Sequence, residues 1–142
     1  MILCDVNVLV YAHRKDDSRH SAFREWLTDL IAAPRPFALS ELVLSGFLRV
    51  VTNPRVFARP TPLADALAFC SALRSRPNAV VVSPGPRHWE IFAGLCDRAQ
   101  VKGNLVADAY LAALAIESGS EWATTDRDFA RFPGLSLAEV PA

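Results

Sequence analysis

The sequence predicts an α/β sandwich with a central, mainly parallel sheet, and three observations lead to this fold class. Short apolar runs alternate along the chain with longer segments whose apolar residues have helical spacing. Proline and glycine separate many of these segments. The length of 142 residues suits one core better than two, so we expect a single domain over residues 1–142.

The elements expected in the first half follow from apolar periodicity and from residues that begin or end helices. Pro34 and Pro36 end a helix whose apolar face includes Phe23. Ser40 is placed to cap the next helix, and three prolines in residues 53–62 predict a loop. The expected order is a strand at 2–4, helices at 6–13 and from 18 or 20 to about 33, a strand at 37–39, and helices at 41–52 and 63–75.

The second half is expected to add two further helices and three short strands. A β-branched run between prolines predicts a buried strand at 79–83. Leucine, alanine, valine and isoleucine dominate residues 105–116, and Gly119 supplies the stop for that helix. The other expected elements are a helix at 87–99 and strands at 122–124 and 135–137.

Composition excludes several classes of protein. No apolar stretch approaches the ~20 residues of a membrane span, and no basic leader precedes the first apolar run, so we expect a cytoplasmic protein without membrane contact. Three cysteines without CxxC spacing indicate buried thiols. The three tryptophans lie in apolar stretches, where packing explains them better than base stacking. The 15 basic and 15 acidic residues cancel, which by itself argues against a nucleic-acid partner.

Four acidic residues lie in unusually apolar surroundings, each on a different element. Asp5 and Asp126 follow predicted strands. Glu41 begins a helix after a third strand-like run, and Asp108 lies in the middle of an apolar helix. In parallel sheets, ligands bind at the carboxyl ends of the strands. An isolated carboxylate in such surroundings needs a helix cap, a cationic partner or a metal ion.

These acids also have structural explanations, which stay open at this point. Asp5 suits a helix N-cap, and Glu41 suits the first turn of a helix. Asp126 suits a turn or the cap of a short helix, whereas Asp108 would need a salt bridge. Together, the four are what a hard divalent cation such as Mg²⁺ or Mn²⁺ requires, because it takes oxygen ligands. Two such ions can activate water for phosphodiester hydrolysis.

Blocks of sequence along nearly the whole chain resemble PIN-domain ribonucleases, and more narrowly the VapC toxins of bacterial VapBC toxin–antitoxin pairs. They are Asp5-Val-Asn7, Ser40-Glu41-Leu-Val with Val50-Val-Thr-Asn-Pro-Arg-Val-Phe57, Asn104-Leu-Val-Ala-Asp-Ala-Tyr-Leu, and Thr124-Thr-Asp-Arg-Asp-Phe. The resemblance implies a PIN-like, Rossmann-like fold in three layers. It also implies a Mg²⁺- or Mn²⁺-dependent endoribonuclease that cuts structured RNA of the tRNA or rRNA class, and inhibition by a cognate VapB-like antitoxin.

The resemblance also assigns roles to particular residues. The catalytic and metal-binding candidates are the acids that match the family's quartet: Asp5, Glu41, Asp108 and Asp126. Asp128 matches a further acidic position whose participation varies. Asn7 and Thr125 match small polar positions that orient a carboxylate or a water, although a first-turn Asn and a strand-end Thr explain them equally well.

The net charge has a different implication if the four acids of the quartet are bound to metal and are left out of the count. The remaining basic residues outnumber the remaining acidic ones, so zero net charge no longer excludes RNA. Arg14, Arg55 and Arg127 are the candidates for contact with RNA phosphates. The resemblance further implies a homodimer.

Two other functions are compatible with the same residues. The chain could be a non-catalytic PIN-like binding module, in which the acids are structural or dock an arginine. It could also be a haloacid-dehalogenase-like phosphatase with Asp5 as the nucleophile. However, Asn7 stands where that family has a second Asp, and its expected lysine within a helix is missing.

Overall fold

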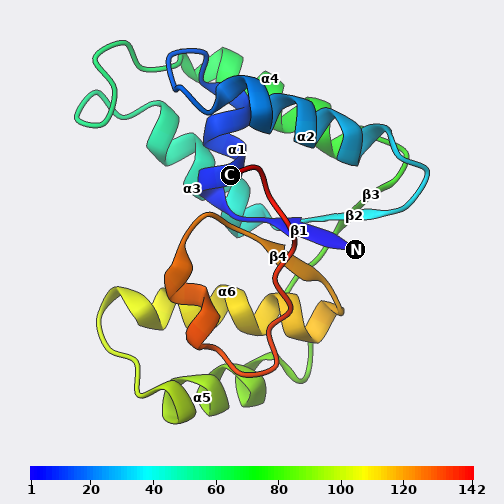
Figure 1. Cartoon of the computed structure of the whole chain (residues 1–142), viewed down its shortest axis with the longest axis vertical. Helices are drawn as coiled ribbons and strands as arrows, with labels where there is room; N and C mark the ends of the chain where they lie inside the picture. Colours follow the sequence, from blue (N-terminus) through cyan, green and yellow to red (C-terminus); the bar gives the residue numbers. More distant parts are fainter.

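The computed structural model describes residues 1–142 and has an all-parallel sheet between two layers of helices (Figure 1). The sheet has the strand order β3-β2-β1-β4, and its strands are β1 (Ile2–Cys4), β2 (Phe37–Leu39), β3 (Ala79–Val81) and β4 (Glu121–Ala123). On one side lie α1 (Val6–His13), α2 (His20–Ala32), α3 (Glu41–Val51) and α4 (Leu63–Arg74). On the other side lie α5 (His88–Ala99) and α6 (Asn104–Ser118), and the 3₁₀ helix η1 (Arg127–Arg131) follows β4. The predicted fold class is confirmed.

The centre of the sheet is the most deeply buried part of the molecule. Leu3 of β1 pairs with Ala38 of β2 on one side and with Trp122 of β4 on the other, and none of the three is more than 1% exposed. Because the strands are parallel, their carboxyl ends share one edge. The residues that follow β1, β2 and β4 are therefore brought to the same edge of the sheet.

Local signals in the sequence set the ends of several helices as expected. Asp5 caps α1, and the Ser40 hydroxyl accepts a hydrogen bond from the Val43 N–H at the start of α3. Gly119 ends α6 with φ of 68°, a left-handed conformation that glycine adopts without steric cost. None of the helices combines the length and apolar character that crossing a membrane demands.

Two strand predictions differ from the structure. The predicted buried strand at 79–83 is β3, but it is the edge strand of the sheet, and Val80 and Val81 are 40% and 42% exposed. Valine favours strands in general, and its preference depends on context, so composition did not distinguish an edge strand from a buried one. The predicted strand at 135–137 is reduced to a single bridge between Leu137 and Trp122.

The cysteines and tryptophans give a mixed outcome. All three cysteines are free thiols, but only Cys4 and Cys70 are buried as expected, whereas Cys96 is partly exposed. Burial raises the pKa of Cys4 to about 12, which makes that thiol unreactive. Trp122 is fully buried, as packing requires. Trp89 is 70% exposed at the start of α5, so the packing explanation is wrong for this residue.

Two mid-helix glycines, Gly46 of α3 and Gly94 of α5, are predicted to respond differently to alanine, because only Gly46 lies close to another helix, α1. A Cβ at Gly46 of α3 would lie 2.9 Å from Cγ2 of Val6, a stiff β-branched side chain beside Asp5. We expect Gly46→Ala to lower the free energy of unfolding by about 1 kcal/mol, because overpacking outweighs the gain in helix propensity. The same change at Gly94 of α5 meets nothing closer than 3.5 Å and should raise it by about 0.5–1 kcal/mol.

Urea denaturation of the two variants and the parent protein measures both effects. Equal stabilisation by both substitutions would show that α1 and α3 are not tightly packed at Gly46.

Candidate active site

Three of the four predicted acids line one cavity at the carboxyl edge of the sheet. Asp5 directly follows β1, and Asp126 lies shortly after the neighbouring β4. Asp108 reaches the same cavity, of about 410 Å³, from α6. The cavity is within the usual size range for small-ligand sites. The parallel register of β1 and β4 therefore brings together acids that are far apart in the sequence.

The Asp5 carboxylate is held rigidly and is only 7% exposed. Its Oδ1 accepts a hydrogen bond of 2.7 Å from the Val6 N–H. Its Oδ2 accepts hydrogen bonds from the Thr124 hydroxyl at 2.7 Å and from the Asn7 amide at 3.2 Å. No cationic side chain forms an ion pair with it. Asp5 is therefore both a helix cap and a buried carboxylate without a counter-charge.

Burial is the largest influence on Asp5 and raises the pKa of its carboxyl above the usual value. The hydrogen bonds that it accepts act in the opposite direction, because they favour the ionised form. The charge of Asp126 raises the pKa further. The net upward shift shows that the hydrogen bonds do not fully replace the lost water.

Asn7 and the residues after β4 form a small polar network behind Asp5. The Asn7 amide donates to Asp5 and to the Thr124 hydroxyl at 3.2 Å, and its carbonyl oxygen accepts from the Thr125 N–H at 3.2 Å. The Thr124 hydroxyl also accepts from the Asp126 N–H at 3.0 Å. Thr125 thus contributes its backbone, whereas the hydroxyl that contacts Asp5 belongs to Thr124, which the sequence analysis did not single out.

Asp108 is partly buried and lies near other negatively charged carboxylates. Burial contributes most to raising the pKa of its carboxyl, followed by the charges of Asp126, Asp5 and Asp128. Arg131 acts in the opposite direction without forming an ion pair with it. The charges of the other acids therefore reach Asp108, so the acids form one electrostatic unit around it.

Asp126 and Asp128 occupy different places in this unit. Asp126 lines the cavity and caps η1, because its Oδ1 accepts from the Asp128 N–H at 2.9 Å. Asp128 is exposed, lies outside the cavity lining and is paired with Arg131 at 3.3 Å. Its charge reaches Asp108, but its side chain is not part of the cavity wall.

Glu41 is separated from the other three predicted acids. It lies in the first turn of α3, its side chain is 68% exposed, and its Oε2 accepts from Arg74 at 2.9 Å. It does not line the cavity. No three acidic, histidine or cysteine side chains are arranged to share a metal ion. Three acids of the predicted quartet therefore line one cavity, whereas Glu41 is paired with Arg74 of α4 outside it.

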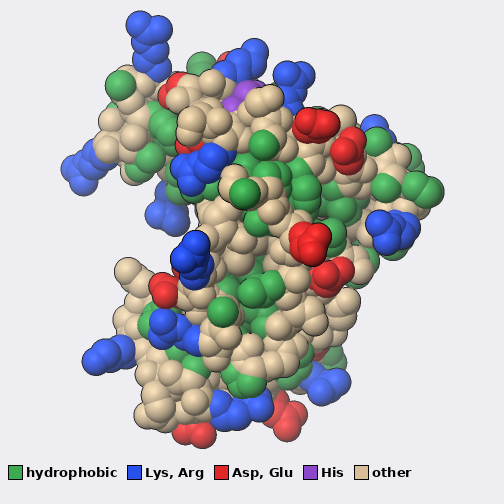
Figure 2. Space-filling model, viewed as in Figure 1, with side chains coloured by type: hydrophobic (Ala, Val, Ile, Leu, Met, Phe, Trp, Pro, Cys, Tyr) green, Lys and Arg blue, Asp and Glu red, His purple; other side chains and the backbone are tan.

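Of the arginines predicted to contact RNA, Arg14 lies in the wrong environment. It is 8% exposed, it donates to both carboxylate oxygens of Asp16, and its Nη1 donates to the Arg59 carbonyl oxygen at 2.8 Å. Arg14, which follows α1, therefore holds the loop after α3 in place. Arg55 and Arg127 are exposed. Figure 2 shows a hollow at its left side with Lys and Arg side chains on the borders above and below it.

The sequence analysis missed the apolar part of the cavity wall. It is formed by Val6, Val10, Tyr11, Val50, Val56, Phe57 and Phe129. Asp17 also lines the cavity, but it is paired with Arg19. These residues come from α1, from the end of α3 with its following loop, and from η1. No local pattern in the sequence indicates that these segments meet.

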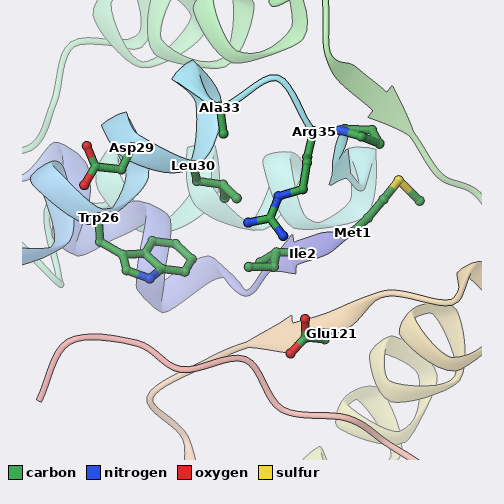
Figure 3. Close-up of a pocket in the computed structure, with 9 residues that line it drawn as sticks. Met1, Ile2, Trp26, Asp29, Leu30, Ala33, Arg35 and Glu121 are labelled. Atoms are coloured by element: carbon green, nitrogen blue, oxygen red, sulfur yellow. The ribbon is translucent and has the colours of Figure 1, made fainter.

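A second cavity, of about 380 Å³, lies at the opposite edge of the sheet, where β1 and β4 begin (Figure 3). Trp26 and Leu30 of α2 form its apolar wall. Asp29, Arg35 and Glu121 supply charges of both signs. None of the predicted site residues lines it, so the acidic cavity is the candidate active site.

Comparison with known proteins identifies the family. The PIN domain family model matches residues 2–135. Over 141 residues, and over 99% of both chains, the sequence is 47% identical to ribonuclease VapC25 and 45% identical to ribonuclease VapC31 of Mycobacterium tuberculosis. The fold is similar to a chain in the crystal structure of VapBC2 from Rickettsia felis bound to a promoter DNA fragment, with TM-score 0.73, 20% identity, and coverage of 99% and 100%. The chain therefore belongs to the PIN-domain family, among the VapC proteins.

Proposed function

We propose that this protein is an endoribonuclease toxin that hydrolyses phosphodiester bonds in structured RNA of the tRNA or rRNA class. The observation that carries the proposal is the cavity in which Asp5, Asp108 and Asp126 lie together, with Asp5 buried and without a counter-charge. Similarity over nearly the whole chain to proteins named ribonucleases supports this choice of reaction.

The donor chemistry of the cavity suits Mg²⁺ or Mn²⁺, because carboxylate oxygens are the ligands that hard divalent cations take. In this proposal Asp5, Asp108 and Asp126 would hold the ion after moving closer together, because the present arrangement does not let three of them share one. Glu41 would join them after leaving Arg74, and Asp128 is an outer acid. Such an ion supplies an activated water and neutralises charge on the phosphate. The raised pKa values of Asp5 and Asp108 are consistent with this role, since an added positive charge would favour their ionised forms.

The chain's own contribution is to fix the Asp5 carboxylate before RNA arrives. The Val6 N–H, the Thr124 hydroxyl and the Asn7 amide hold Asp5 in one orientation. Preorganised ligands are not rearranged during the reaction, which lowers its barrier. Arg55 and Arg127 are exposed and free of ion pairs, so they are available to RNA phosphates.

A VapB-like antitoxin is the proposed protein partner, and a homodimer is proposed as the toxin's own assembly. An apolar groove of about 580 Å³ runs between α3 and α6. Leu42 and Val106, at 54% and 39% exposure, lie in this groove. Exposed apolar surface of this kind is typical of protein interfaces. The structural neighbour from Rickettsia felis is a VapBC complex, which supports the choice of partner.

The first prediction concerns RNA cleavage by the purified protein. Asp108→Asn should lower the cleavage rate at least about 100-fold, because metal ions supply several kcal/mol of transition-state stabilisation and each 1.36 kcal/mol is a factor of ten. Glu41→Gln should lower it less, by about 10-fold, since Glu41 lies outside the cavity. The measurement is digestion of total cellular RNA with mapping of the new 5′ ends.

Exposed Glu25 offers a matched control, since Glu25→Gln on α2 also removes one negative charge far from the cavity lining. Full cleavage by Asp108→Asn would contradict the proposal and favour a non-catalytic binding module.

The second prediction concerns metal removal. EDTA should abolish cleavage, and excess Mg²⁺ or Mn²⁺ should restore it. The same ions should raise the thermal unfolding midpoint of the parent protein, because a ligand that binds only the folded state stabilises it. Asp108→Asn should lose most of this rise. Cleavage that persists in EDTA, with no effect of either ion on unfolding, would exclude the proposed ion.

The third prediction concerns stability in the absence of divalent ions. The folded state raises the pKa of Asp108, so folding takes up protons and the ionised form is destabilising. Asp108→Asn removes this cost. Its free energy of unfolding should exceed that of the parent at pH 7. The difference should shrink as the pH falls through about 4 and should be nearly gone by about pH 3, where Asp108 is protonated in both states.

Urea denaturation between pH 3 and pH 8 measures the difference. A variant that is less stable than the parent at every pH would show that Asp108 is a structural carboxylate.

A further inference from the structure

The loop between α3 and α4 reaches the acidic cavity with an aromatic ring. Phe57 of this loop is half-buried and lines the same cavity as Asp5, Asp108 and Asp126. Its neighbour Val56 also lines the cavity and is 54% exposed. In Figure 1 this loop extends to the upper left, above the N-terminal end of α6, and the hollow in Figure 2 lies between the two.

Arg14 holds the ring of Phe57 from one side. The guanidinium carbon lies 4.0 Å from the centroid of the ring, which is cation–π geometry. The guanidinium cannot move away easily, because it donates to both oxygens of Asp16 and to the Arg59 carbonyl. A planar cation thus supports one face of Phe57.

The loop backbone is fixed independently of Arg14. The Phe57 N–H donates to the Asn53 carbonyl at 3.1 Å, and the Thr61 N–H donates to the Val51 carbonyl at 2.8 Å. The Asn53 side chain also accepts from the Arg55 N–H at 2.9 Å. Little conformational freedom remains for a ligand to remove, so a contact with the ring has a small entropic cost.

Phe57 differs from Tyr11 and Phe129, the two other aromatic rings in the cavity wall, in how much of it other rings cover. Phe129 is only 2% exposed and packs against Trp122 with centroids 5.3 Å apart. Arg19 covers Tyr11 at 3.7 Å, and Phe23 packs against its edge with centroids 5.2 Å apart. No other aromatic ring packs against Phe57. Of the three rings, Phe57 is therefore the one that is only half-buried and has no aromatic neighbour, which makes it the candidate for contact with a planar ligand.

We infer that Phe57, supported by Arg14, is a stacking surface for a nucleobase next to the phosphate that lies at the acids. This inference rests on the proposed ribonuclease function. A phosphate needs only the polar part of the cavity, whereas the flat, apolar face of a base matches the ring. The base must be unpaired and unstacked from its neighbours, because bases inside a duplex do not offer a free face.

The test is a double-mutant cycle between the ring and the base, measured by binding alone. All proteins carry Asp108→Asn so that RNA is not cut. The probes are a fluorescent, unstructured 12-nucleotide RNA of mixed sequence and the same RNA with its central bases replaced by abasic sites. Dissociation constants come from fluorescence anisotropy at several salt concentrations.

For the protein that keeps Phe57 and carries only Asp108→Asn, replacing the central bases by abasic sites should weaken RNA binding about 10-fold, within the range known for base–aromatic stacking. The Phe57→Leu variant should bind the intact and the abasic RNA equally, with the lower affinity that the Phe57-containing protein has for the abasic RNA. The Phe57→Trp variant should still prefer the intact RNA. The dependence of binding on salt should be the same for all three proteins, because no charge has been removed. Trp89→Leu removes another exposed ring, outside the cavity, and should have no effect.

The inference is overturned if Phe57→Leu still distinguishes the two RNAs, or if base removal has no effect on the Phe57 protein. Equal losses for Phe57→Leu and Trp89→Leu would also overturn it. Thermal unfolding of each variant verifies that it is folded. Cleavage by the protein without Asp108→Asn tests the proposed function separately, so a failed stacking test and a failed ribonuclease assay are distinguishable.

Discussion

The burial of neighbouring carboxylates at the carboxyl edge of the sheet, together with the repulsion between them, is the energetic cost that the rest of the fold has to offset. Asp5 and Asp126 are brought together by the pairing of β1 with β4, and Asp108 is added by α6. Burial raises the pKa of both Asp5 and Asp108, and the neighbouring carboxylates raise it further. The packing of the sheet and helices must therefore stabilise the fold enough to tolerate this arrangement. Local destabilisation of this kind is typical of functional sites.

The cavity combines two kinds of wall. Asp5, Asp108, Asp126 and Asn7 form a polar wall, which the Thr124 hydroxyl supports from behind Asp5. The valines and rings opposite form an apolar wall, and Phe57 is fixed there by Arg14. Arg14, which the sequence suggested as an RNA contact, is therefore buried and positions the loop between α3 and α4 instead.

Most of the fold could be predicted because its signals are local. Helix caps such as Asp5 and Ser40 and the glycine after α6 act over one or two turns. The exposure of β3 could not be predicted, since it depends on which strand ends the sheet. Trp89 illustrates the same difficulty, because an apolar neighbourhood in the sequence did not prevent 70% exposure of its side chain.

The sequence by itself determined the order of strands and helices, the caps and the presence of acids in apolar segments, because these depend on neighbours along the chain. The tertiary structure decided which acids meet. Asp5 and Asp126 converge through strand pairing, while Glu41 turns to Arg74 of α4. It also decided that Thr124 supplies the hydroxyl to Asp5 and that Phe57 joins the cavity. Such contacts depend on the packing of distant segments, which no local pattern specifies.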